Sequence, residues 1–178
     1  MTQLPHTITD SEIIKLNEKR VRALRFNLKR GDSKQIEYLE QFSNRVYKLC
    51  GWHTELYIGP ENIKNLYELI LRLPAVSIDH LGLGQSGFEY VLKLAERGVG
   101  VKASGFGRVG VDIKKALQTI YSANPSSLMF GTDLPSTRAD RPFNEEDIQL
   151  VIDSLVDQEA IDNVLYKNAI KFYRINPL

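Results

Sequence analysis

Five short runs with a strand-like pattern, each followed by a segment with helical periodicity, constrain the fold of this chain more than any other feature of its sequence. The runs recur at intervals of about 22 to 32 residues, which leaves room for a crossover helix between neighbouring strands. This spacing favours parallel strands with right-handed connections. The sequence therefore predicts an α/β fold with a parallel sheet of five βα units. The strands are predicted at residues 22–28, 53–58, 75–79, 99–104 and 127–132.

Helix start and stop signals fill the intervals between these runs. Thr9 and Glu12 have the spacing of a capping box, which predicts a helix to about Arg20. Four more helical segments are predicted: from the turn Gly31-Asp32-Ser33 to Cys50, from Gly59-Pro60, from Phe88 to Gly98, and over 111–123. The remainder, from Asn144, is predicted to be helical with breaks near Gln158 and Asn168.

Composition excludes several classes of partner. The formal net charge is +1, which gives no electrostatic ground for binding nucleic acid or an anionic membrane. We see no apolar stretch close to the roughly 20 residues of a membrane span, and the N-terminus lacks a secretory signal. Cys50 is the only cysteine, so no internal disulfide can form. A soluble cytoplasmic protein with one domain, residues 1–178, is expected.

Polar residues lie at or just beyond the predicted strands. The carboxyl ends of parallel strands share one rim of the sheet, where ligands bind. Singly, each residue has an ordinary explanation, such as a backbone hydrogen bond for His80 or a turn for Asp133. Together they offer the base, the electrophilic stabiliser and the anchors that hydrolysis needs. The candidates are Arg25, Asn27, Arg30, His53, Tyr57, Asp79, His80, Lys102, Ser104, Arg108, Thr132 and Asp133.

The stretch 82–87 has the G-x-G-x-x-G spacing of a dinucleotide-binding turn. That fingerprint requires the first glycine directly after the strand and an acidic residue about 20 positions further on. Here the residues 79–81 intervene, and the next predicted strand ends in Lys102-Ala103-Ser104. We therefore expect these glycines to let the chain bend into the following helix.

Several segments together resemble the amidohydrolase-2 family of TIM-barrel hydrolases, and within it the branch of pyrone dicarboxylate lactonases. They are "VSIDHLG", "VGVKASGFGR" and "LMFGTDLP", with "RVRALRFNLKRG" and "GWHTELYI" in the same order. The resemblance extends from about Ile13 to Tyr173. It implies that the chain corresponds to strands four to eight of an eight-stranded barrel, as an N-terminally truncated, amidohydrolase-related domain.

The resemblance also implies roles for individual residues. Asp133 matches the general base that activates water, and His80 matches the histidine beside the scissile carbonyl. Arg30 is one residue out of register with the family pattern. The positions that would hold the substrate and its carboxylates are Arg25, Arg30, Tyr57 and Arg108.

The family's metal-binding members use an H-x-H strand, and this sequence contains none. Its histidines are His6, His53 and His80. Catalytic zinc usually has three protein ligands, whereas His80 and Asp133, the candidate ligands here, supply two. The lactonase branch works without a metal. We therefore expect that no cofactor is required and that a divalent metal such as zinc is not tightly bound.

The expected function is hydrolysis of a lactone, or of another ester of a carboxylate-bearing small molecule, by water that Asp133 activates. The alternative is a non-catalytic barrel fragment, or a subunit that needs a partner chain. A five-stranded sheet cannot close the barrel, so the strands at 23–28 and 127–132 are predicted to have apolar open edges. Residues 2–8, the helices after Asn144, a second copy or another polypeptide would cover them.

Overall fold

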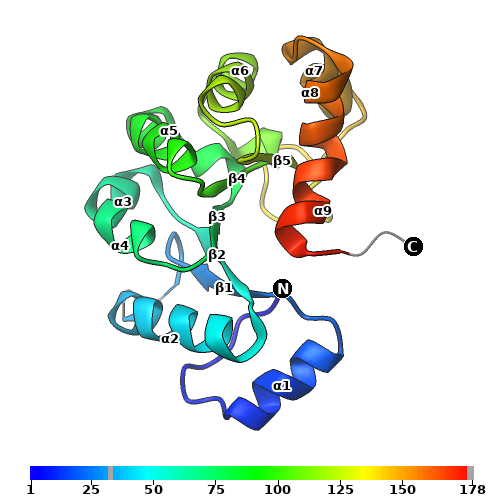
Figure 1. Ribbon diagram of the computed structural model, residues 1–178. Helices are drawn as coiled ribbons and strands as arrows, with labels where there is room; N and C mark the ends of the chain where they lie inside the picture. Colours follow the sequence, from blue (N-terminus) through cyan, green and yellow to red (C-terminus); the bar gives the residue numbers. More distant parts are fainter. Residues whose placement is uncertain (32–33, 176–178) are drawn as a thin grey trace.

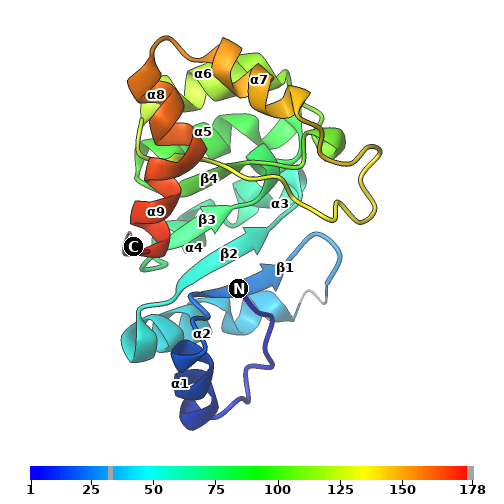
Figure 2. The ribbon, with the colours of Figure 1, turned by 90° about the vertical axis from the view of Figure 1, so that its right-hand side faces the viewer.

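The computed structural model describes residues 1–31 and 34–175 of the chain, and five strands form one parallel sheet within it. The strand order is β1-β2-β3-β4-β5, and the arrows labelled in Figure 2 point the same way. Each strand lies inside its predicted run, so the predicted parallel sheet is confirmed. The bounds are Ala23–Asn27 for β1, His53–Tyr57 for β2, Val76–Ile78 for β3, Gly100–Ala103 for β4 and Leu128–Phe130 for β5.

The helices follow the predicted signals with two differences. The helix that Pro60 opens is divided at Leu66, and the break expected near Asn168 is a change from π- to α-helical hydrogen bonding. The turn predicted at Asp32-Ser33 lies outside the described residues. The helices are α1 Asp10–Glu18, α2 Gln35–Cys50, α3 Pro60–Asn65, α4 Tyr67–Leu71, α5 Phe88–Glu96, α6 Ile113–Ala123, α7 Glu146–Ser154, α8 Gln158–Asp162, η4 Asn163–Lys167 and α9 Asn168–Tyr173. Short 3₁₀ turns are η1 His80–Gly82, η2 Gln85–Gly87 and η3 Phe106–Arg108.

One face of the sheet packs against helices α2 to α6 (Figure 1). Side chains alternate between the two faces of a strand, so every second residue of β1 and β2 enters this layer. Phe26 meets Phe42 of α2 with ring centroids 6.3 Å apart, and Thr54 donates a hydrogen bond of 2.8 Å to Ser43 of the same helix. The intervening residues, such as Glu55, therefore face the opposite side of the sheet.

The glycine-rich stretch serves close packing. A Cβ atom on Gly84 would lie 3.0 Å from the Pro60 ring, and one on Gly87 would lie 2.6 Å from the Pro60 carbonyl oxygen. Such distances are shorter than van der Waals contact, so both positions require glycine or a shift of helix α3. The glycines bring η2 against α3, as expected for a bend between β3 and α5.

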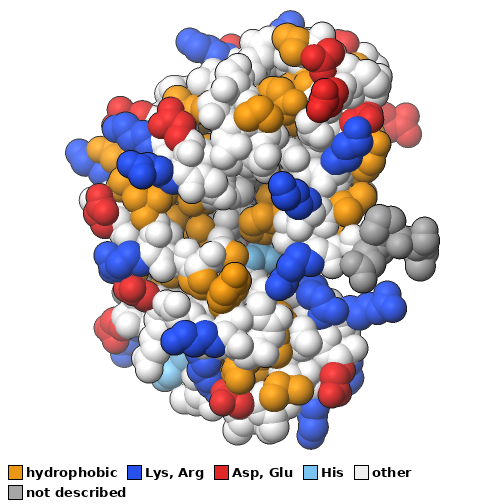
Figure 3. Space-filling model, viewed as in Figure 1, with side chains coloured by type: hydrophobic (Ala, Val, Ile, Leu, Met, Phe, Trp, Pro, Cys, Tyr) orange, Lys and Arg blue, Asp and Glu red, His pale blue; other side chains and the backbone are white. Residues whose placement is uncertain are grey.

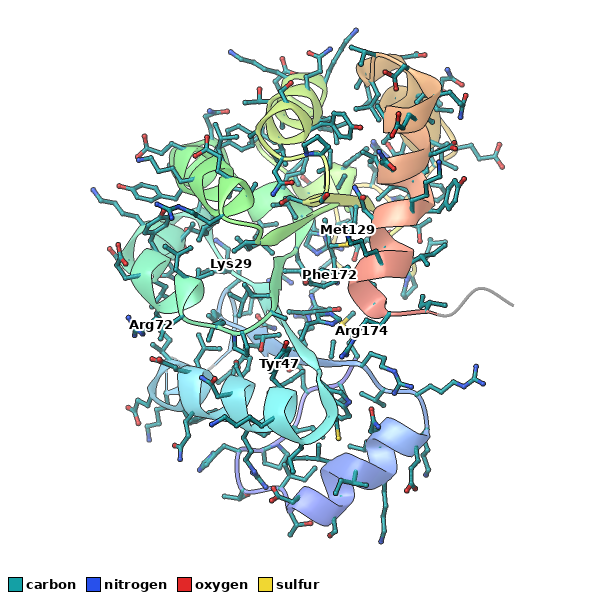
Figure 4. All side chains as sticks on the ribbon, viewed as in Figure 1. Lys29, Tyr47, Arg72, Met129, Phe172 and Arg174 are labelled. Carbon is teal, nitrogen blue, oxygen red and sulfur yellow. The ribbon has the colours of Figure 1, made fainter. Side chains whose placement is uncertain are left out.

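Helix α9 covers the amino-terminal half of the opposite face (Figures 1 and 2). The ring of His53 lies 4.6 Å from that of Phe172 and 4.8 Å from that of Tyr173. Phe172 and Met129 lie between the helix and the sheet (Figure 4), and Gly100 gives them room. His53, which was predicted at the carboxyl rim, is therefore a packed residue at the other end of β2, because it begins that strand.

Both outer strands are covered by segments of the chain itself. Thr2 pairs with β1: its N–H donates to the Ala23 carbonyl at 3.0 Å, and its carbonyl accepts from Arg25 N–H at 2.8 Å. On the other side, the buried Asn168 amide donates to the carbonyls of Leu128 and Pro125 at 2.9 and 2.7 Å. Both belong to segments that were predicted from the sequence to cover the open edges, namely residues 2–8 and the helices after Asn144.

Acidic, basic and apolar side chains are interspersed over the face shown in Figure 3, in keeping with a net charge near zero. Within residues 1–31 and 34–175, every helix is too short or too polar to cross a lipid bilayer.

Candidate active site

A cavity of about 550 Å³ opens at the carboxyl rim of the sheet, beyond the half that helix α9 covers. Loops that follow β1, β3, β4 and β5 contribute to its wall. The parallel arrangement explains why residues far apart in sequence meet here, because all five strands end at this rim. Every residue predicted for catalysis or substrate binding lines this cavity: Arg25, Arg30, Tyr57, His80, Arg108 and Asp133.

Asp133, Arg108 and His80 form the centre of the site. Arg108 donates from Nε to one carboxylate oxygen of Asp133 (Oδ2) at 2.8 Å, and its Nη2 lies 2.6 Å from the same oxygen. The other oxygen, Oδ1, lies 3.8 Å from Nε2 of His80. The three side chains come from segments after β5, β4 and β3, and they are close enough to contact one small ligand, as predicted.

The backbone at this centre is left-handed in three places. His80 has φ 54°, Asp133 has φ 59° and Gly105 has φ 60°. Residues with a Cβ atom rarely adopt this region, and such strain gathers at functional sites where the surrounding structure enforces it. A Cβ atom on Gly105 would lie 2.7 Å from Nδ1 of His80 and 3.0 Å from both Asp133 Oδ2 and Arg108 Nε. Gly105 therefore provides the room in which the three side chains meet.

His80 is buried beneath the cavity, with only 4% of its surface exposed. Its Nδ1 lies 3.0 Å from the Ser104 hydroxyl, and the edge of its ring meets Tyr57 with centroids 5.5 Å apart. Burial lowers the pKa of His80, although the carboxylates of Asp79 and Asp133 oppose that effect. The imidazole is therefore neutral at pH 7.

Two of the three arginines predicted to hold the substrate already have acidic partners. Arg25 Nη2 lies 2.8 Å from Oδ2 of the buried Asp79, just as Arg108 pairs with Asp133. The guanidinium of Arg25 also lies 5.5 Å from the centre of the Tyr57 ring, and that of Arg30 lies 6.0 Å from it. Tyr57 thus contributes its ring face to both arginines, as a cation–π partner.

A buried network lies beneath the cavity, and sequence patterns indicated only some of its members, without Glu55 and Tyr173. Lys102 Nζ lies 2.8 Å from Oε1 of Glu55 and 3.3 Å from Oδ1 of Asp79, so it links β4 to β2 and β3. The Glu55 oxygen also accepts from the Tyr173 hydroxyl at 2.9 Å and lies 3.2 Å from His53 Nε2. One signal was available: Glu55 is an acid in the middle of a predicted strand, and an unpaired carboxylate is unstable once such a strand is buried in a sheet.

This network keeps its charges in spite of burial. Burial alone raises the pKa of Glu55, but the hydrogen bond from His53 and the nearby Lys102 outweigh it, so the pKa lies well below its usual range. Burial alone lowers the pKa of Lys102, but the carboxylates of Asp79 and Glu55 leave it raised. Burial also raises the pKa of Tyr173 to about 12. At neutral pH the network beneath the cavity therefore contains the ammonium of Lys102, the carboxylate of Glu55 and the neutral phenol of Tyr173.

The donor set at this site does not suit a catalytic zinc. His80 and Asp133 would be two ligands, whereas such a zinc usually has three. No group of three or more His, Cys, Asp or Glu side chains is arranged around a common point anywhere in residues 1–31 and 34–175. Arg108, whose Nη2 lies 2.6 Å from Oδ2 of Asp133, would also repel a cation bound to that carboxylate. The expectation that no metal is required stays a prediction.

Comparison with known proteins connects this geometry to one family. The family profile described as "Amidohydrolase" matches residues 2–175. None of the curated proteins matches the chain.

Solved structures with the same fold include a probable 2-pyrone-4,6-dicarboxylic acid hydrolase of Acinetobacter baumannii with citric acid bound. Its TM-score is 0.81 at 22% identity, over 98% of this chain and 72% of that one. A Pseudomonas putida protein provisionally assigned the same activity has a TM-score of 0.78 at 22% identity, over 99% and 72%. An Agrobacterium tumefaciens protein, in its apo form, has a TM-score of 0.83 at 16% identity, over 100% and 70%. These likenesses confirm the predicted partial-barrel fold.

Proposed function

Because the chain belongs to the amidohydrolase family, we propose that it hydrolyses a lactone, or another ester of a carboxylate-bearing small molecule, with water activated by Asp133. One observation carries this proposal: a carboxylate and a neutral imidazole, those of Asp133 and His80, face each other across 3.8 Å inside an arginine-lined cavity. A base beside a hydrogen-bond donor is the arrangement that attack of water on a carbonyl requires.

In the first step Asp133 takes a proton from a water molecule, and the hydroxide forms a bond to the carbonyl carbon of the ester. Oδ1 of Asp133 is the oxygen available to accept this proton, because Oδ2 already accepts a hydrogen bond from Arg108. His80 stabilises the developing oxyanion. If Ser104 donates to Nδ1, the proton of the neutral ring is on Nε2, the nitrogen nearest Asp133. A neutral donor of this kind can polarise a carbonyl without transferring its own proton.

In the second step the tetrahedral intermediate collapses. The carbon–oxygen bond to the leaving group breaks, and the leaving oxygen takes back the proton that Asp133 holds. A lactone thereby gains one water and becomes a hydroxy acid, and Asp133 returns to its ionised form. His80 keeps its own proton throughout, so both groups end the cycle as they began it.

The charge of the cavity supports an anionic substrate. Cationic side chains outnumber carboxylates among the lining residues, which are Arg25, Arg30, Lys102, Arg108 and Arg138 against Asp79 and Asp133. A guanidinium matches the two oxygens of a carboxylate in one plane. The similar A. baumannii protein was solved with citric acid bound, so a small polycarboxylate is compatible with that fold.

The test compares wild type with Asp133→Asn, using 2-pyrone-4,6-dicarboxylate as the substrate and the loss of pyrone absorbance as the readout. Asparagine has nearly the same shape but cannot accept the proton of water. We expect turnover to fall on the order of a hundredfold or more, with an unchanged far-ultraviolet circular dichroism spectrum. Equal turnover in the two proteins would assign Asp133 to a turn. A wild type that hydrolyses no lactone would favour a non-catalytic barrel fragment.

A further inference from the structure

The loop after β5 brings a fourth arginine to the cavity, which neither the sequence motifs nor the proposed chemistry uses. Arg138 lines the cavity and is exposed to solvent. Among the residues that the structure describes, its side chain has no hydrogen-bond or ion-pair partner. It is therefore a cation at the cavity whose charge is available to a ligand.

Hydrogen bonds hold the loop in place both before and after Arg138. Before it, the Thr137 carbonyl accepts a hydrogen bond of 3.3 Å from Arg108. After it, the Asp140 N–H donates to the Gly107 carbonyl at 3.1 Å. Ser136 is buried, and its hydroxyl oxygen accepts a hydrogen bond of 3.3 Å from the backbone N–H of Phe143. The backbone at Arg138 is thus held against the segment that also carries Arg108, so its side chain starts from a defined position beside the site.

The four arginines of the cavity fall into two pairs. Arg25 and Arg108 each lie within 2.8 Å of a carboxylate oxygen. Arg30 and Arg138 have no such partner among the described residues. A substrate carboxylate that recruited a paired arginine would have to separate a partly buried ion pair, which is costly because it leaves a charge uncompensated. The unpaired arginines do not impose that cost.

These two unpaired arginines also approach from different directions. Arg30 follows β1 and Arg138 follows β5, the two outermost strands in the sheet order. We propose that Arg138 is a specificity-determining residue that binds an anionic group of the substrate across the cavity from Arg30. This inference rests on the proposed function, since it concerns the same site. Together, Arg30 and Arg138 would select substrates with two carboxylates, one for each arginine.

Binding of citrate, measured by titration calorimetry, tests the assignment without any need for turnover. Arg138→Gln removes the guanidinium, and Arg97→Gln is the control, because Arg97 is an exposed arginine outside the cavity. We expect Arg138→Gln to weaken binding about tenfold, as for a partly exposed charge-assisted contact, while the control stays within about twofold of wild type. Arg138→Lys, which keeps the charge but loses the fork, should recover part of the loss.

Kinetics with two lactones distinguish recognition from a structural effect. With 2-pyrone-4,6-dicarboxylate, Arg138→Gln should raise KM about tenfold and change kcat little. With δ-valerolactone, which has no carboxylate, its KM should equal that of the control. The inference is wrong if Arg138→Gln matches Arg97→Gln in citrate binding, or if both lactones are affected equally. A wild type that binds citrate but hydrolyses neither lactone would refute the proposed hydrolysis and leave Arg138 as an anion-binding residue. A wild type that binds no citrate and hydrolyses neither lactone would refute both.

Discussion

Gly105 allows the sharpest test of how the centre of the site is built. Its φ of 60° is left-handed, and an added Cβ atom would lie 2.7 Å from His80 Nδ1 and 3.0 Å from atoms of Arg108 and Asp133. The substitution Gly105→Ala therefore combines two effects, backbone strain and collision with three site residues. The substitution Gly98→Ala isolates the backbone strain, since Gly98 has a φ of 89° and a Cβ atom there would meet nothing within 4 Å.

The magnitudes follow from these two geometries. A left-handed alanine costs roughly 1–2 kcal/mol relative to glycine, and both substitutions incur this. Only Gly105→Ala adds a collision, and overpacking of an ordered region costs about 1–3 kcal/mol. We therefore expect the free energy of unfolding of Gly105→Ala to be lower than that of Gly98→Ala by about 1–3 kcal/mol. In a chain of this length each kcal/mol corresponds to about 2–4 °C in Tm.

Urea unfolding, followed by circular dichroism, measures the stability difference, and lactone turnover measures the effect on the site. Because the new methyl group displaces His80 from its place beside Asp133, turnover should fall in Gly105→Ala and stay close to wild type in Gly98→Ala. The reasoning is refuted if the two variants have the same stability and the same turnover. That result would mean that the segment moves aside at no cost.

Three further expectations concern the network and the sheet edge. Lys102→Met should lower the free energy of unfolding by about 3–5 kcal/mol, since it leaves the buried Glu55 and Asp79 without their cation; a loss below about 1 kcal/mol in urea unfolding would count against the network. Because the folded-state pKa of Glu55 is depressed, its contribution is present above the unfolded value of about 4.3 and is lost as pH falls below it. Between about pH 5 and pH 2, wild type should therefore lose more stability than Glu55→Gln, and parallel curves would contradict this. Asn168→Ala should cost about 1–3 kcal/mol and speed hydrogen exchange in β5, because the Leu128 carbonyl at that edge loses its donor; unchanged exchange there would show that the edge is protected by other groups.

Local signals in the sequence were sufficient for most of the fold. Thr9 and Glu12 form both hydrogen bonds of the capping box that their spacing predicts, and helix α1 begins directly after Thr9. The five predicted runs contain the five strands, and the strands pair in parallel as predicted. These features depend on residues that are neighbours in the chain, so the chain pattern reports them directly. His53 was placed at the wrong rim, although it is the first residue of the predicted strand 53–58 and of β2, and the first residue of a parallel strand lies at the amino rim.

The location of the candidate site also followed from the sequence. His80, Arg108 and Asp133 were predicted at one rim because each comes at or after the end of a parallel strand, and the cavity is lined by all three. A resemblance to a family supplied their roles, and those roles are still predictions. Five successive βα units therefore determine where ligands can bind, but not which charges remain available to them.

Tertiary structure decided the charge partners. Arg25 pairs with Asp79 and Arg108 with Asp133, which leaves Arg30 and Arg138 available, and no spacing rule distinguishes these four arginines. Tyr173 reaches Glu55 from a position 118 residues further along the chain. Whether a buried charge is stable depends on distances of about 3 Å to partners that strand register and helix docking bring together. Periodicity and capping signals act over a few residues and carry no information about those distances.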